Sequence, residues 1–140
     1  MRSPLAALGA AGIALGAVLI WAPTAAADPG SGDHVYVDHV LWAKWGDLSS
    51  LRVYPTDAAR ALTHQPGSAA QADQAWAEVL SQSPDADLPG MHEQFLCHWT
   101  FAELAEPGKT SWNLEPWRPE VAPEVMLASG CNPGGSEEPF

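Results

Sequence analysis

The sequence is poor in positive charge. Only six of its 140 residues are Lys or Arg, against 17 Asp and Glu, and the formal net charge is −11. Proteins that bind nucleic acid or anionic lipid use clustered Lys and Arg side chains to neutralise phosphates. Because so few basic residues cannot line a phosphate-binding groove, we expect neither nucleic acid nor an anionic membrane surface as a partner.

Cysteine is also scarce, since the chain contains only Cys97 and Cys131. In an exported protein, two cysteines predict one disulfide. A metal site with His98 is the alternative, but zinc needs four ligands at set spacings, and Cys97 and His98 are adjacent. The zinc-protease pattern H-E-x-x-H begins at His92 and fails, because Leu96 stands where the second His is required. We therefore expect one disulfide, no metal and no cofactor.

Residues 1–27 have the pattern of a secretory signal peptide. Arg2 supplies the positive charge, residues 5–21 form an uncharged apolar run, and 25–27 are three alanines that fit the cleavage site. The alternative is an uncleaved membrane anchor, although a 17-residue run is at the lower limit for spanning a bilayer. We expect a secreted, extracytoplasmic protein that begins at Asp28 and is not stably inserted in a membrane after cleavage.

The remaining chain is typical of a folded domain, because residues 28–140 hold six tryptophans and disordered chains are poor in aromatics. Alternating apolar residues predict strands, and apolar residues at a spacing of three and four predict helices. The predicted strands are 34–45, 51–54 and 110–114, with a turn at 46–50, and the predicted helices are 56–62, 68–81, 91–101 and a short one from 123.

These elements predict a small α+β domain, in which an antiparallel hairpin or three-stranded sheet is covered by two or three helices. Residues 116–123 contain three prolines and are expected to be extended. We place a flexible mature N-terminus at 28–33, the globular domain at 34–133 and a disordered tail at 134–140.

A cluster of polar side chains interleaved with tryptophans lies within 21 residues of the C-terminal half. Its polar members are His98, Lys109, Asn113, Glu115 and Arg118, and its tryptophans are Trp99, Trp112 and Trp117. In a functional interpretation, His98 is a general base and Arg118 holds an anionic group. In a structural interpretation, Glu115 and Arg118 pair across a turn and Arg118 stacks on a tryptophan.

Two functions follow from this cluster. The first is a binding or interaction module without catalysis, in which an unknown extracellular or cell-envelope ligand meets a surface of Trp99, Trp112, Asn113 and Trp117. The alternative is a small secreted hydrolase or transferase, whose candidate catalytic residues are His98, Lys109, Glu115 and Arg118. We favour the first, because the chain has no nucleophile elbow G-x-S-x-G, Walker loop or Rossmann glycine pattern.

Several blocks of the sequence together carry a resemblance to a known family. They are Leu-Arg-Val-Tyr-Pro-Thr at 51–56, Ala-Trp-Ala-Glu at 75–78, Gly-Met-His-Glu-Gln-Phe-Leu-Cys-His at 90–98, Lys-Thr-Ser-Trp-Asn-Leu-Glu-Pro-Trp-Arg-Pro at 109–119 and Cys-Asn-Pro at 131–133. The chain resembles the DUF2599 family of secreted actinobacterial proteins over roughly residues 36–134. The resemblance implies export, a single domain and a bridge between Cys97 and Cys131. It implies no catalytic residues, because the family is defined without a known activity.

Overall fold

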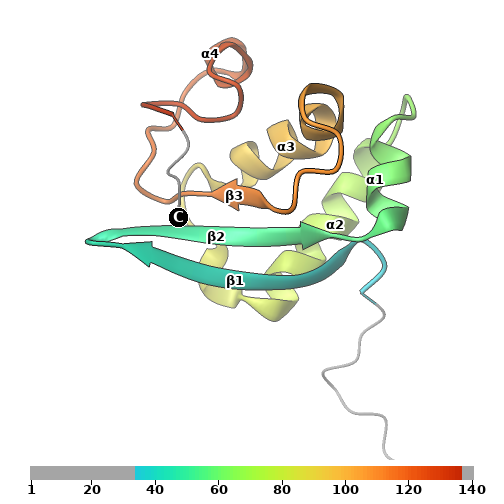
Figure 1. The fold of residues 1–140 in the computed structure, drawn as a ribbon, viewed down its shortest axis with the longest axis horizontal. Coiled ribbons are helices and arrows are strands. Elements are labelled where there is room, and N and C mark those ends of the chain that lie inside the picture. The colour runs from blue at the N-terminus through green and yellow to red at the C-terminus, as the bar shows by residue number, and fades with distance from the viewer. Residues whose placement is uncertain (1–33, 137–140) are drawn as a thin grey trace, which may run out of the picture. The chain divides into compact units, whose positions relative to one another are not determined.

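Three antiparallel strands form one sheet in the order β1-β2-β3 (Figure 1). Strand β1 spans Val37–Trp45, β2 spans Leu48–Pro55 and β3 spans Trp112–Leu114. The predicted hairpin is confirmed, and the third strand joins it beside β2. The turn is shorter than expected, because Trp45 already pairs with Leu48. Ser50, which we expected in the turn, therefore belongs to the sheet.

This computed structural model describes residues 34–136, all within one compact unit. The predicted signal peptide at 1–27 and the predicted flexible segment at 28–33 lie outside the described residues. The tail predicted from 134 is described only as far as Ser136.

Four α-helices and one short 3-10 helix complete the described part of the chain. They are α1 (Asp57–Thr63), α2 (Ala69–Gln82), η1 (Pro84–Ala86), α3 (Met91–Ala105) and α4 (Pro123–Ala128). Thr56 caps α1, as its side chain accepts a hydrogen bond from the Ala59 N–H. Helix α3 continues four residues beyond the expected end at 101, which adds Leu104 to its length. None of the helices in 34–136 is both long and apolar enough to span a bilayer.

One face of the sheet carries the main hydrophobic core. Leu51 and Val53 of β2 are fully buried, whereas Arg52 and Tyr54, which alternate with them, are half-buried. Helices α2 and α3 pack on the buried face (Figure 1), and their aromatic residues fill the space between the layers. This arrangement confirms the predicted α+β domain.

A second, smaller hydrophobic cluster joins α3 to α4. The Cys97–Cys131 disulfide lies at its centre, with a Cα–Cα distance of 5.6 Å, and Met126 of α4 is buried beside it. The predicted disulfide is thus confirmed. Because α4 has only six residues, this bridge and Met126 hold it against α3.

The segment 116–123, predicted to be extended, begins with a turn at 116–118 instead. The Arg118 N–H donates a hydrogen bond to the Glu115 carbonyl at 3.2 Å, which closes a turn. A proline ring restricts its own φ but also fits the second position of a turn, and Pro116 has that position here. The turn brings the Arg118 side chain back over Glu115.

Candidate functional site

The structure separates the four candidate catalytic residues into two groups. His98 and Lys109 line an open hollow of about 460 Å³ beside α3. Glu115 and Arg118 lie instead in a closed network, where their side chains are 1% and 0% exposed. A single active site of all four residues is therefore not formed.

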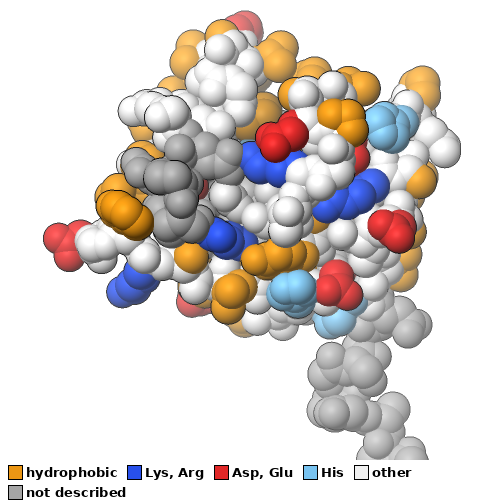
Figure 2. All heavy atoms as spheres, in the orientation of Figure 1, with side chains coloured by type: hydrophobic (Ala, Val, Ile, Leu, Met, Phe, Trp, Pro, Cys, Tyr) orange, Lys and Arg blue, Asp and Glu red, His pale blue; other side chains and the backbone are white. Residues whose placement is uncertain are grey.

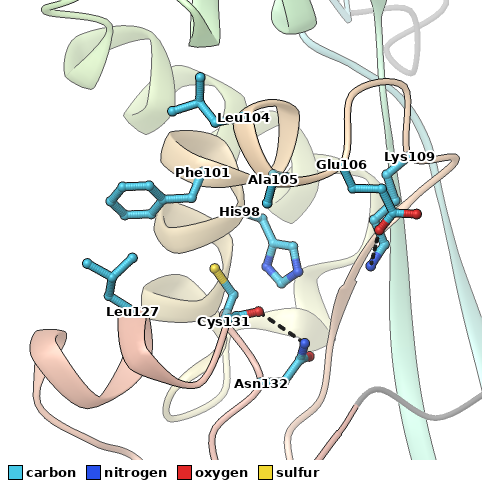
Figure 3. A pocket seen from close by; sticks show the side chains of 11 residues that line it. His98, Phe101, Leu104, Ala105, Glu106, Lys109, Leu127, Cys131 and Asn132 are labelled. Atoms are coloured by element: carbon cyan, nitrogen blue, oxygen red, sulfur yellow. Dashed lines mark hydrogen bonds and ion pairs between the residues drawn. The ribbon is translucent and has the colours of Figure 1, made fainter.

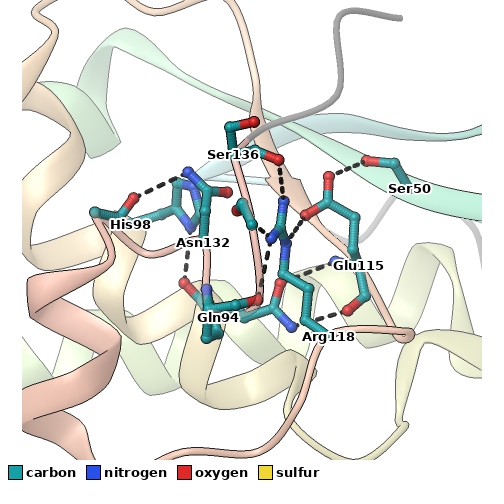
Figure 4. Close-up of polar contacts among 10 residues, drawn as sticks. Ser50, Gln94, His98, Glu115, Arg118, Asn132 and Ser136 are labelled. Carbon is teal, nitrogen blue, oxygen red and sulfur yellow. Dashed lines mark hydrogen bonds and ion pairs between the residues drawn. The ribbon is translucent and has the colours of Figure 1, made fainter.

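The Glu115–Arg118 network fixes the C-terminal segment to the sheet (Figure 4). Arg118 Nε donates to Glu115 Oε2 at 2.5 Å, and Ser50 of β2 donates to Glu115 Oε1 at 3.1 Å. Arg118 Nη1 donates to the carbonyl oxygens of Pro133 and Gly135, and Nη2 donates to that of Ser136. These bonds occupy the guanidinium with protein acceptors, as the structural interpretation predicts.

The tail that we predicted to be disordered, residues 134–140, begins at the Glu115–Arg118 network. Gly135 and Ser136 fall within its predicted range of 134–140, yet both provide carbonyl oxygens that accept from Arg118. Residues 137–140 lie outside the described residues. The glycine-rich composition of this stretch could not reveal the bonds, because the donor lies 17 residues earlier in the chain.

Gln94 of α3 links this network to the helix. Its Nε2 donates to the Glu115 carbonyl and its Oε1 accepts from the Glu115 N–H, each at 2.9 Å. His98, one turn later, donates from Nδ1 to the Gln94 carbonyl at 2.8 Å and is 4% exposed. The hydrogen bond to a carbonyl fixes the imidazole tautomer at Nδ1.

Most of the residues that we predicted to form a binding surface are buried in the domain. Trp112 is fully buried and Trp99 is 2% exposed, and their ring centroids lie 6.1 Å apart in an edge-to-face arrangement. Trp99 also donates from Nε1 to Ser68 Oγ at 3.0 Å. Asn113 is buried and accepts from Ser111 Oγ at 2.7 Å. These side chains pack inside the domain, so they do not present the recognition surface that we expected.

Trp117 is the tryptophan of the predicted set that remains half-buried. The Arg118 guanidinium carbon lies 4.4 Å from the centroid of its ring, a cation–π contact. The ring therefore covers Arg118, which is the stacking that the structural interpretation anticipated.

The hollow beside His98 lies between α3 and α4 (Figure 3). Phe101 of α3 and Leu127 of α4 lie next to each other at one side, and Lys109 and Glu106 lie at the other. The Lys109 Nζ is 3.9 Å from Glu106 Oε2. Most of the lining is apolar, with Leu104 and Ala105 adding to Phe101.

Two further hollows adjoin the first along α3. One of about 290 Å³ lies on the α4 side and shares Phe101 and Leu127 with it. The other, of about 590 Å³, lies against the connection between α1 and α2 and shares Leu104. Leu96 lines both of these further hollows.

The solvent side of α3 is therefore the floor of all three hollows, and we call it the α3 outer face. It consists of Leu96, Thr100, Phe101 and Leu104, together with Leu127 of α4. Leu104 is 64% exposed and Leu127 is 51% exposed. Figure 2 shows hydrophobic side chains gathered over the part of the molecule that contains α4.

Our sequence reasoning missed this face for an identifiable reason. It ended the helix at 101 and so left Leu104 outside it. The longer helix turns Leu104 to the same side as Leu96, because residues eight apart lie on one face. The sequence did contain a signal for this face, because the apolar residues of this helix are not confined to one stripe.

Residues 34–136 contain no group of three or more His, Cys, Asp or Glu side chains placed to hold a metal ion. Among their carboxylates, Asp85 has its pKa lowered, chiefly because Ser83 donates a hydrogen bond to it. Asp85 lines a different hollow, together with Trp42 and Lys44.

The comparisons with known proteins show the family. The chain is 57% identical over 123 residues to uncharacterized proteins of Mycobacterium bovis and Mycobacterium tuberculosis, covering 81% of this chain and 82% of each relative. An uncharacterized protein of Mycobacterium leprae is 50% identical over 102 residues, covering 73% of this chain and 82% of the relative. No solved structure matches the chain. The model of a protein family of unknown function, DUF2599, matches residues 37–134, and the chain belongs to this family.

Proposed function

We propose that this domain is a secreted, non-catalytic interaction module, and that it binds its partner on the α3 outer face. The observation that carries this proposal is that α3 keeps an exposed apolar residue on its solvent side, besides those that it buries in the core. Met91, Phe95 and Trp99 belong to the main core, and Leu96 is half-buried against it. Leu104 is 64% exposed and lines two of the hollows. The solvent side of a surface helix normally carries charged and polar residues, so an apolar side chain exposed there is available to a partner.

The size and openness of this surface favour a macromolecular partner. Small-molecule pockets usually bury most of their ligand. Here Leu104 and Leu127 line adjoining hollows and are more than half exposed. Exposed apolar patches of this kind mark protein interaction sites.

Export remains part of the proposal. It is supported by the pattern of residues 1–27 and by the Cys97–Cys131 bridge, since disulfides persist in oxidising compartments. The acidic composition adds solubility outside the cell.

The alternative is the small hydrolase or transferase. Of its four candidate catalytic residues, only His98 and Lys109 line the same hollow. Without Glu115 and Arg118, which are engaged with each other, this pair has no acidic partner from the predicted set. We therefore keep catalysis as the second candidate only.

Binding of the neutral apolar dye Nile red tests the proposed surface. The oxidised wild-type domain should bind the dye with saturable fluorescence enhancement, and the double variant Leu104→Ser/Leu127→Ser should weaken binding about tenfold, the equivalent of about 1.4 kcal/mol. Leu41→Ser is the matched control, because Leu41 is 56% exposed on β1. Equal losses in both variants, or no saturable binding, would reject the α3 outer face as the site.

A further inference from the structure

We propose that the partner of the α3 outer face is a basic amphipathic helix of another protein. This inference rests on the proposed interaction function and specifies what the surface recognises. It follows from two independent features of the surface, the charges around it and the shape of its floor.

The charges around the apolar floor are mostly negative. Each hollow is lined by one exposed carboxylate: Glu106 in the first, Glu93 in the second and Asp73 in the third. Among residues 34–136, Lys109 is the one Lys or Arg that lines any of the three, and its Nζ is 3.9 Å from Glu106 Oε2. Complementary charges steer association and suppress wrong partners. A partner with Lys or Arg flanking its apolar residues meets this requirement.

The shape of the floor suits a helix. Leu96, Thr100 and Leu104 are spaced by four residues, so they form a row of about 12 Å along α3 at a rise of about 1.5 Å per residue. The small Thr100 side chain in the middle of the row leaves room for a larger partner residue. Rows at a spacing of four pack well into the grooves of another helix.

The hollows also have walls on both sides of this row. The connection between α1 and α2, including Pro66 and Ser68, forms one wall. Helix α4, held by the disulfide, forms the other with Leu127. A helix lying between the walls would contact α3 with one apolar stripe, which is the helix-in-groove mode of recognition.

The same charges disfavour a second copy of this chain as the occupant. A symmetric pair would bring two sets of Asp73, Glu93 and Glu106 together, on chains that each carry a formal net charge of −11. Like charges facing each other across an interface oppose association. We therefore assign the surface to a different, basic protein.

Two synthetic peptides test the inference with the oxidised domain. Both are 16-residue amphipathic helices with the same leucine stripe, and they carry either lysines or glutamates on the flanking positions. Fluorescence anisotropy at low ionic strength should show the lysine peptide binding at least tenfold more tightly than the glutamate peptide. Equal affinities would overturn the assignment of a basic partner.

Charge variants test whether Asp73, Glu93 and Glu106 cause the tighter binding of the lysine peptide. The triple variant Asp73→Asn/Glu93→Gln/Glu106→Gln should weaken the lysine peptide at least tenfold. The control is a triple variant with the same change in net charge at exposed carboxylates that line none of the three hollows: Asp38→Asn/Asp47→Asn/Asp87→Asn. The control should change the affinity less than twofold, and an equal loss in both would mean that net charge alone attracts the peptide.

These experiments distinguish a failure of the proposed surface from a failure of the proposed basic partner. If Leu104→Ser/Leu127→Ser weakens Nile red binding about tenfold while the two peptides bind alike, the proposed surface is supported and the basic partner is rejected. If that double variant leaves dye binding unchanged, the surface itself is rejected. Sedimentation without peptide adds a further check, since a wild-type dimer that Leu104→Asp dissociates would assign the face to a second copy.

Discussion

Replacing Arg118 with alanine is the sharpest test of the structural role of the Glu115–Arg118 network. The Arg118 side chain is fully buried and Glu115 is 1% exposed. In Arg118→Ala, the Glu115 carboxylate would stay buried with the Ser50 hydroxyl as its remaining side-chain donor. The carbonyl oxygens of Pro133 and Gly135 would also lose their donor.

The expected cost is large. Removing one partner of a buried ion pair destabilises a protein by about 3–5 kcal/mol, because an uncompensated charge remains. A small domain has a total free energy of unfolding of only about 5–15 kcal/mol. With a urea slope of about 2 kcal/mol per molar, a loss of about 4 kcal/mol lowers the unfolding midpoint by about 2 M.

Urea unfolding of the oxidised wild-type and variant proteins measures this shift. Lys44→Ala is the control, since Lys44 is exposed and loss of an exposed charge costs under about 1 kcal/mol. The double variant Glu115→Leu/Arg118→Met should cost less than Arg118→Ala, because it leaves no unpaired charge. A midpoint shift near zero for Arg118→Ala, with an unchanged slope, would refute the structural role and make Arg118 a binding residue.

Three other measurements test separate parts of the description. Denatured, non-reduced protein should contain no reactive thiol, and reduction of the Cys97–Cys131 bridge should cost up to roughly 4 kcal/mol for a loop of this length. Ser83→Ala should raise the pKa of Asp85 toward 3.8, seen by NMR titration, since the Ser83 hydrogen bond lowers it. The stabilisation from this bond is present above the unfolded-state pKa and is lost as pH falls through the lowered value. Intact mass of secreted protein should correspond to a chain beginning at Asp28, and a cell-bound full-length product would contradict signal cleavage.

Local patterns were sufficient for most of the secondary structure. The alternation in 34–45 and 51–54 predicts a hairpin, and Thr56 followed by Asp57 predicts the start of α1, because both signals depend on near neighbours. Element ends were less accurate. The turn at Gly46 and Asp47 is shorter than expected, and α3 is longer, since tertiary pairing decides where a strand begins and where a helix ends.

Buried carboxylates could not be identified from the sequence alone. Glu78 is buried and accepts from the backbone N–H groups of Tyr36 and Val37. Glu103 is buried and pairs with Arg60. Each partner lies about 40 residues away, so no local pattern records the compensation that allows burial.

The sequence by itself determined the α+β class, the pairing of Cys97 with Cys131 and the two possible roles of Arg118. These follow from periodicity, from a count of two cysteines and from side-chain chemistry. Only the tertiary structure decided that Arg118 is enclosed by Glu115 and the C-terminal carbonyls, and that Leu104 is left exposed on the solvent side of α3 among the described residues. The physical reason is that burial and partner choice depend on contacts between distant segments, whereas periodicity reports only which residues share a face.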